Sequence, residues 1–193
     1  DSELLADSII AQITKDMTNE DNLEEKSAKI WSDALSKNVN AFQILSPIRG
    51  ENYGTENLNQ ACQLHKSSYW LKRGDLDGVT LFDKVIQVYN RPPSNPLPGY
   101  DYIQRKPCKA DIYNGELGIV KQHAFDNTEF KKPYFRIKRF SVGFAGKDHV
   151  AVNYGQELGK DENGRYIQSV NPGENIELGY AISVHKAQGS EFE

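Results

Sequence analysis

The spacing of apolar residues changes near Lys72, and this change constrains the fold more than any other feature of the 193-residue chain. Before Lys72, apolar residues recur every three or four positions, which predicts amphipathic helices around one short strand. After Val79, short apolar runs alternate with turn residues, as in antiparallel β-structure. The chain is therefore expected to join an α/β part to a β part, in one large domain or two small ones.

The part before Lys72 has the order of an α/β layer with a parallel sheet. Two helices are expected between Asp1 and Asn38, followed by a short strand at Phe42–Leu45. A loop with two glycines at 50–54 then leads to a third helix, which Thr55 begins. This third helix is expected to bury Leu58, Ala61 and Leu64.

The part after Val79 is expected to form a small antiparallel barrel. The pair Asn114-Gly115 is a strong turn signal. The stretch 91–107 holds five of the eight prolines, so a long loop is expected there in place of a helix or a central strand. The strands are expected at 79–81, 84–89, 117–122, 134–140 and 149–152. An apolar segment at 176–184 follows, and then a polar loop at 185–190.

Charge and cysteine content exclude several classes of protein. The net charge of −4 argues against a protein that coats nucleic acid, although it leaves room for a local basic groove. Cys62 and Cys108 lie far apart without the spacing of metal ligands, which favours free thiols in a reducing, cytoplasmic compartment. No metal site is expected. Neither a membrane span nor a signal peptide is expected, because no apolar run is long enough and no charged leader precedes one.

The segment 178–192, which reads LGYAISVHKAQGSEF, holds the most informative group of side chains. A predicted strand delivers the Ser183 hydroxyl, the His185 imidazole and the Lys186 ammonium group to one loop. These groups suit contacts with phosphates. Gly189 permits close approach to the backbone, and the carboxylate two residues later suits ribose hydroxyls. From this chemistry alone, an ordinary polar loop between a strand and a helix is the favoured explanation of the segment.

Residues 180–191 resemble motif V of superfamily 1 helicases, with the pattern A-x-T-x-H-K-x-Q-G-S-E. Ser183 stands where the family usually has threonine, and the hydroxyl is kept. Residues 43–59, QILSPIRGENYGTENLN, resemble the stretch around motif IV of RecD-like members. Residues 82–90 and 113–120, FDKVIQVYN and YNGELGIV, resemble the signature of their inserted SH3-like barrel. The matches follow the family order, although Phe82 replaces the usual glycine.

This resemblance implies a C-terminal portion of a RecD-like DNA helicase, similar to the exodeoxyribonuclease V alpha subunit. The implied fold is α/β, a partial second RecA-like domain of the P-loop NTPase type with an inserted SH3-like β-barrel. Residues 1–72 would begin the RecA-like domain, and residues 73–172 would form the barrel with its proline-rich loop at 91–107. Residues 173–193 would return to the RecA-like domain. Because the chain starts without Met and stops directly after motif V, we expect a piece of a longer motor.

The implied activity is ATP-dependent DNA unwinding in the 5′ to 3′ direction, with ATP and Mg²⁺ bound by the whole protein. The sequence has no GxxxxGK[ST] phosphate loop, and Gly146-Lys147 lacks both the upstream glycine and the following Ser or Thr. The chain is thus expected to hold no catalytic residue, to bind no cofactor alone and to be inactive alone. The implied partners are single-stranded DNA, ATP, the first RecA-like domain and possible helicase–nuclease subunits, with no membrane.

The resemblance also implies roles for single residues. The ATP-binding residues would be Arg49, Gln188, Gly189 and Glu191. The DNA-binding residues of motif V would be Ser183, His185 and Lys186. Arg49 lies near motif IV, where some superfamily 1 members use an arginine on the γ-phosphate, but an exposed loop arginine explains it equally.

The run 131–140, KKPYFRIKRF, is the basic and aromatic segment of the chain. Cations interleaved with aromatic rings can hold single-stranded DNA by charge and stacking. The same run is also typical of a barrel strand with a solvated basic face. The candidate DNA-binding residues here are Lys131, Lys132, Tyr134, Arg136 and Lys138.

Two other functions stay open. A Pif-type or relaxase-linked helicase would have the same fold, although the GSE sequence at 189–191 favours the RecD-like group. An SH3-like interaction module without enzymatic activity, with the α/β part as its scaffold, would belong to another class.

Overall fold

The computed structural model describes residues 39–40, 43–71, 74–125, 137–156, 158, 160 and 163–187. The two helices expected before Asn38 lie outside this part of the chain. Within it, no helix is both long and apolar enough to cross a membrane.

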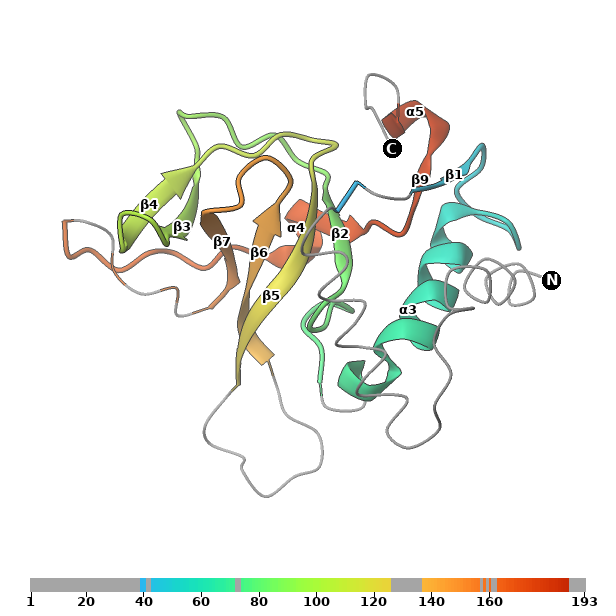
Figure 1. The fold of residues 1–193 in the computed structure, drawn as a ribbon, viewed down its shortest axis with the longest axis horizontal. Helices are drawn as coiled ribbons and strands as arrows, with labels where there is room; N and C mark the ends of the chain where they lie inside the picture. Colours follow the sequence, from blue (N-terminus) through green and yellow to red (C-terminus); the bar gives the residue numbers. More distant parts are fainter. Residues whose placement is uncertain are drawn as a thin grey trace.

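Most of the described chain forms one antiparallel sheet of seven strands (Figure 1). The strands are β2 (Lys84–Gln87), β3 (Leu97–Asp101), β4 (Lys106–Ala110), β5 (Leu117–Phe125), β6 (Ile137–Phe144), β7 (Val150–Gly155) and β8 (Ile176–Leu178). They lie in the order β4-β3-β7-β6-β5-β2-β8. The expected closed barrel is wrong for the described residues, because the outer strands β4 and β8 pair only inward and leave the sheet open.

A second, parallel pair of strands joins distant parts of the sequence. Strand β1 (Ile44–Ser46) pairs with β9 (Ala181–Ser183), with Ile44 opposite Ala181 and Ser46 opposite Ser183. Helix α3 (Thr55–Leu71) follows β1 and packs against β9. Two one-turn helices, α4 (Pro172–Asn175) and α5 (Val184–Ala187), flank β8 and β9. The mixture of helix and strand predicted from the sequence is therefore confirmed.

Strand β2 separates two hydrophobic cores. Because successive side chains of a strand point to opposite faces, Val85 enters one core and Ile86 the other. The larger core fills one face of the antiparallel sheet with side chains such as Phe140, Val152 and Tyr154. The smaller core joins Leu117 and Ile119 of β5 to Ile182 of β9, and so attaches the parallel pair to the large sheet.

Helix α3 buries a more polar stripe than the sequence predicted. Leu58 is buried as expected and Ala61 is half-buried, but the side chain of Leu64 is 62% exposed. Cys62 and Gln63 are buried in its place. The helical period is compatible with burial of either residue 63 or residue 64. Gln63 is the buried one because its amide donates hydrogen bonds to the Gly78 carbonyl and to Asp83. Neither Cys62 nor Cys108 forms a disulfide.

The proline-rich stretch is not a long loop, which corrects the expectation for residues 91–107. It contains β3 and the start of β4, which pair as a hairpin at one edge of the sheet. Pro98 pairs only toward β4, because the register with β7 begins at Gly99. Pro107 lies in the outer strand, where a missing N–H disturbs no ladder beyond it.

Most other strand predictions are confirmed within a few residues, but two local predictions were wrong. Residues 79–81 form a turn with one isolated bridge, between Leu76 and Val79. His185 to Ala187 lie in α5, not in a loop. The predicted turn at Gly115 is present, with a φ of 97°. Phe82 has a φ of 66°, so it keeps a backbone conformation that favours glycine.

Candidate functional site

The carboxyl ends of β1 and β9 lie together, because Ser46 and Ser183 are opposite each other in the parallel register. In parallel α/β sheets, ligands bind outside the carboxyl ends of the strands. The loop after β1 carries Arg49, and α5 after β9 carries His185 and Lys186. Four of the predicted site residues, with Ser183 among them, are thus brought to one edge of the molecule.

The carboxylate of Glu177 connects the two strand ends. Its Oε1 lies 3.2 Å from Nη2 of Arg49, and its Oε2 lies 3.1 Å from Nζ of Lys186. Arg49 Nε also donates to Oε1 of Glu56 at 2.9 Å. We call Arg49, Glu56, Glu177 and Lys186 the strand-end cluster. It contains two cations and two carboxylates, so its formal charge is balanced.

The strand-end cluster is open to solvent. The Arg49 side chain is 68% exposed, and its hydrogen bond to Glu56, followed by the charge of Glu177, raises the pKa of its guanidinium group. Exposed ion pairs each contribute at most about 1 kcal/mol, because water screens the attraction. Arg49 and Lys186 can therefore exchange their carboxylate partners for another anion, such as a phosphate, at little cost in stability.

The loop that carries Arg49 is closed tightly. The buried Ser46 hydroxyl lies 3.0 Å from the Ile48 carbonyl oxygen and 2.7 Å from that of Tyr53. A Cβ atom added to Gly54 would lie 1.9 Å from the Gly50 carbonyl oxygen, which no side chain could tolerate. Gly54 thus allows the chain to fold back directly before α3 begins.

Strand β9 is held by two side-chain amides, that of Asn59 on the edge away from β1 and that of Gln43 on the edge beside β1. Asn59 of α3 donates from Nδ2 to the Ala181 carbonyl and accepts from the Ala181 N–H, both at 2.8 Å. Gln43 donates to the carbonyl oxygens of Gly179 and Tyr180 at 3.1 and 2.9 Å. The Asn59 amide therefore occupies the place that a further strand would take, and it satisfies the open backbone groups.

A buried carboxylate ties these elements to the large sheet. The Asp83 side chain accepts hydrogen bonds from Gln63 Nε2 at 2.6 Å, the Thr80 N–H at 2.8 Å and the Tyr180 hydroxyl at 2.8 Å. The neighbouring Lys84 is fully buried, and this burial lowers the pKa of its ammonium group to about 8. The Asp83 carboxylate holds Tyr180 directly before β9 and lies away from solvent, so it supports the site without forming part of it.

Within α5, the predicted residues differ in their surroundings. The Ser183 hydroxyl accepts from the Lys186 N–H at 3.3 Å and so caps the helix, which uses the oxygen that was expected to contact phosphate. His185 is exposed. Lys138 lies in β6 of the other sheet, not at the strand ends. The remaining predicted site residues lie outside the described part of the chain: Lys131, Lys132, Tyr134, Arg136, Gln188, Gly189 and Glu191.

Sequence reasoning missed Glu177 and Asn59. Asn59 ends the segment that resembles motif IV, so the resemblance offered a signal for it. Glu177 lies in a short strand and had no signal, because only the folded chain brings it to Arg49 across 128 positions. The described residues contain no group of His, Cys, Asp or Glu side chains that could hold a metal ion.

A comparison with models of protein families and with curated proteins found no match to this chain.

Proposed function

We propose that this chain is part of a RecD-like superfamily 1 DNA helicase, in which it supplies one wall of the ATP site and part of the single-stranded DNA track. One observation carries the proposal. The segments that resemble motif IV and motif V are far apart in sequence, yet they pair as β1 and β9 with their carboxyl ends together. Arg49 and Lys186, one from each segment, then meet at Glu177.

In this proposal β1, α3 and β9 belong to the second RecA-like domain, and the open antiparallel sheet stands in the place of the family's inserted SH3-like barrel. At Gly179 the chain leaves the antiparallel sheet and returns to the parallel strand pair, because β8 still pairs with β2 whereas β9 pairs with β1. The Gly179 N–H donates to the Lys84 carbonyl at 2.8 Å, and an added Cβ would lie 2.8 Å from the Val85 carbonyl carbon. Glycine permits this close passage between the two sheets.

The strand-end cluster suits a phosphate ligand. Phosphoryl transfer is accelerated by cations that hold the transferring group, and Arg49 is an exposed cation beside a parallel strand end. We assign Arg49 to the γ-phosphate, Gln188, Gly189 and Glu191 to the rest of ATP, and His185 and Lys186 to DNA phosphates. The phosphate loop and the Mg²⁺-binding acid would come from the first RecA-like domain, so no catalytic residue is assigned here.

Hydrolysis assays test this function. The chain alone should release phosphate only at background rate, with or without single-stranded DNA, because phosphoryl transfer needs the phosphate loop and metal. In a longer polypeptide with that loop, Glu191→Ala should raise KM for ATP, and His185→Ala should weaken the stimulation of hydrolysis by DNA. The matched control is Lys160→Ala, at an exposed position outside the strand-end cluster.

Each outcome has a clear meaning. Wild-type KM and wild-type stimulation in both variants would show that the motif V assignment is wrong, and would favour the interaction module. Rapid, DNA-stimulated turnover by the chain alone would contradict the proposal that it supplies only one wall of the site.

A further inference from the structure

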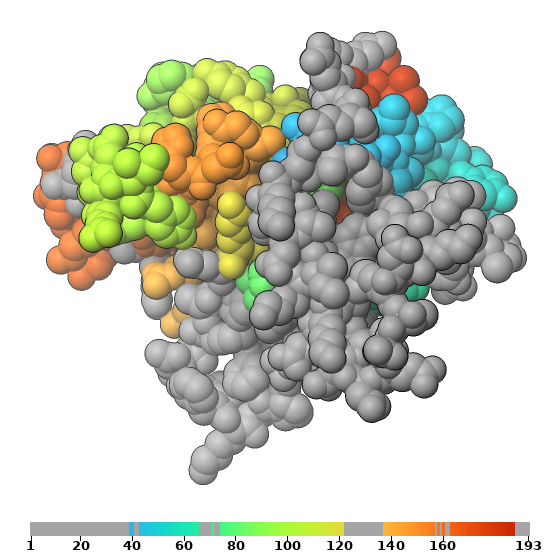
Figure 2. All heavy atoms as spheres, viewed as in Figure 1, coloured from blue at the N-terminus to red at the C-terminus, as the bar shows by residue number. Residues whose placement is uncertain are grey.

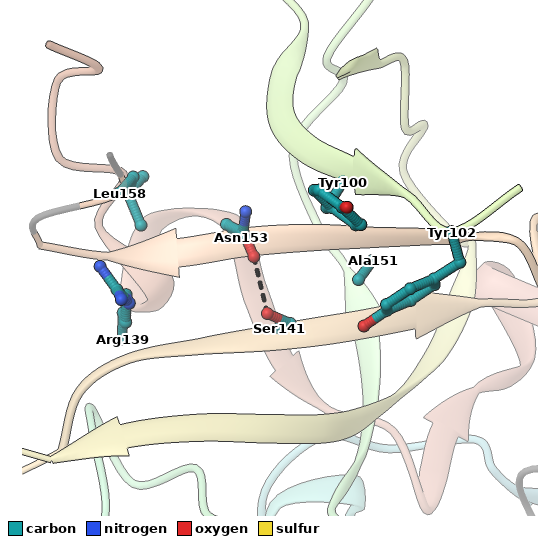
Figure 3. A pocket seen from close by; sticks show the side chains of 7 residues that line it. All are labelled: Tyr100, Tyr102, Arg139, Ser141, Ala151, Asn153 and Leu158. Atoms are coloured by element: carbon teal, nitrogen blue, oxygen red, sulfur yellow. Dashed lines mark hydrogen bonds between the residues drawn. The ribbon is translucent and has the colours of Figure 1, made fainter. Parts of the chain in front are cut away.

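A hollow of about 410 Å³ lies on the antiparallel sheet, away from the strand-end cluster (Figure 3). Its walls come from β3, β6 and β7 and from the residues that follow β3 and β7. Figure 2 shows the surface of the β3–β4 hairpin beside that of β6 and β7, with β1 and α5 at the other side of the view. The hollow is lined by Tyr100, Tyr102, Arg139, Ser141, Ala151, Asn153 and Leu158.

Strand register explains why these side chains share one face. Tyr100 lies opposite Ala151, and Ser141 lies opposite Asn153. Because side chains alternate along each strand, this face is opposite to the one that buries Phe140, Val152 and Tyr154. The large core therefore fills one side of the sheet, and the polar and aromatic residues that line the hollow lie on the other side, with Leu158 beside them.

Two tyrosine rings form a platform in the hollow. The ring centroids of Tyr100 and Tyr102 lie 5.5 Å apart, with an angle of 68° between the ring planes. The two residues are 37% and 44% exposed, so parts of both rings are open to a ligand. Large exposed aromatic side chains on a sheet face are suited to stacking with nucleobases, since every base has a π-face.

Hydrogen-bonding groups lie next to this platform. The Ser141 hydroxyl donates to Asn153 Oδ1 at 2.6 Å, which fixes the orientation of the Asn153 amide. The Asn153 nitrogen points away from Ser141 (Figure 3). An amide N–H group suits the carbonyl and ring-nitrogen acceptors of a base.

The face is basic although the whole chain carries a net charge of −4. Arg139 lines the hollow, and Lys109 lies on the same face because it pairs with Pro98, two residues before Tyr100. Lys121 reaches over Gly143, where an added Cβ would lie 2.4 Å from Lys121 Cε. None of the paired positions on this face of β3, β4, β6 and β7 is acidic.

We propose that this sheet face binds single-stranded nucleic acid, with bases stacked on Tyr100 and Tyr102 and the backbone held by Arg139, Lys121 and Lys109. The volume is in the range of small-ligand sites, and the combination of aromatic rings with cations favours nucleotides over an apolar peptide. In this proposal the proline-rich β3–β4 hairpin has a role, because it carries Tyr100 and Tyr102 to the hollow. The proposal does not depend on helicase activity and concerns a site remote from the strand ends.

The test is binding of fluorescein-labelled oligo(dT) and oligo(U) to the whole chain, followed by fluorescence anisotropy. Tyr100→Ala and Tyr102→Ala should each weaken binding by about 5- to 150-fold, the effect of losing one stacked base. Tyr100→Phe should stay near wild type, because it keeps the ring. Tyr166→Ala is the control at a tyrosine outside the hollow. Arg139→Ala and Lys121→Ala should each reduce the slope of log affinity against log salt by about 0.7.

Photo-crosslinking to the wild-type chain tests the site even if the tyrosine variants fail to fold. An oligonucleotide with 5-iodouracil, irradiated with the wild-type chain, should attach to Tyr100 or Tyr102 in peptide maps, whatever the stability of the variants. The peptides that contain Tyr100 or Tyr102 are distinct from the peptide that contains residues 183–187, so the maps themselves separate this site from the strand ends. Cross-links confined to other segments, tyrosine variants that fold and bind like wild type, or saturable binding of a proline-rich peptide in place of oligonucleotide would overturn the proposal.

Discussion

Arg49, in the loop after β1, and Lys186, in α5 after β9, bind the same carboxylate, that of Glu177. Neither cation is near the other in sequence, and their meeting depends on the pairing of β1 with β9. The Glu177 carboxylate neutralises part of this positive charge, and Glu56 supplies the second carboxylate of the cluster. Glu177 therefore competes with any anion that approaches the strand ends.

Glu177→Gln should strengthen the binding of single-stranded DNA to the chain. The change releases Arg49 and Lys186 from a negative charge but keeps the size of the side chain. Each additional phosphate contact should steepen the slope of log affinity against log salt by about 0.7. The free energy of unfolding should change by about 1 kcal/mol at most, because the pair with Arg49 is exposed and the pair with Lys186 is partly open to water.

Fluorescence anisotropy over a salt series, beside thermal melting, checks this expectation. Glu174→Gln is the matched control, since Glu174 is exposed on α4 and makes no contact with the two cations in the described structure. Unchanged or weaker DNA binding by Glu177→Gln would argue that the strand-end cluster is only a structural ion pair.

Gly54→Ala should destabilise the protein far more than Gly50→Ala. The added methyl group at Gly54 would collide with the carbonyl oxygens of Gly50 and Arg49, whereas nothing lies within 4 Å of the position at Gly50. Backbone atoms cannot move aside cheaply, so we expect a loss of about 2 kcal/mol or more for Gly54→Ala and under about 1 kcal/mol for Gly50→Ala. Urea denaturation measures both. Equal losses would contradict the tight closure of the loop.

The sequence located the strands and the site loops, but it could not supply their partners. Apolar runs identified β2, β5 and β7 because hydrophobic alternation is a local property. The pairing of Ile44 with Ala181 is nonlocal, and the resemblance assigned both segments to one domain without predicting that they pair. The sequence predicted that α3 buries Leu64, which is wrong. Gln63 is buried in its place, because its amide donates a hydrogen bond to the Asp83 carboxylate.

Proline content was misleading for a related reason. Prolines exclude central strands, and the expectation of a loop at 91–107 followed from that rule. The rule does not apply at the edge of a sheet, where Pro107 needs no partner on its outer side. The position of a strand at an edge depends on the pairing of the whole sheet. The sequence therefore could not predict that the edge hairpin brings Tyr100 and Tyr102 together.

Lys84 should make stability rise with pH in alkaline solution. Burial lowers its pKa from 10.5 to about 8 in the folded protein, so below pH 8 the ammonium group is charged in both states and its desolvation opposes folding. Between pH 8 and 10.5 the folded state has lost the proton that the unfolded state still holds. The free energy of unfolding therefore increases through this window, by about 1.4 kcal/mol per pH unit and about 3 kcal/mol in all. Lys84→Met lacks this titration and keeps every other titratable side chain. Urea denaturation from pH 7.5 to 10.5 should show wild type gaining on Lys84→Met as pH rises, and parallel curves would mean that Lys84 keeps its charge in the folded protein.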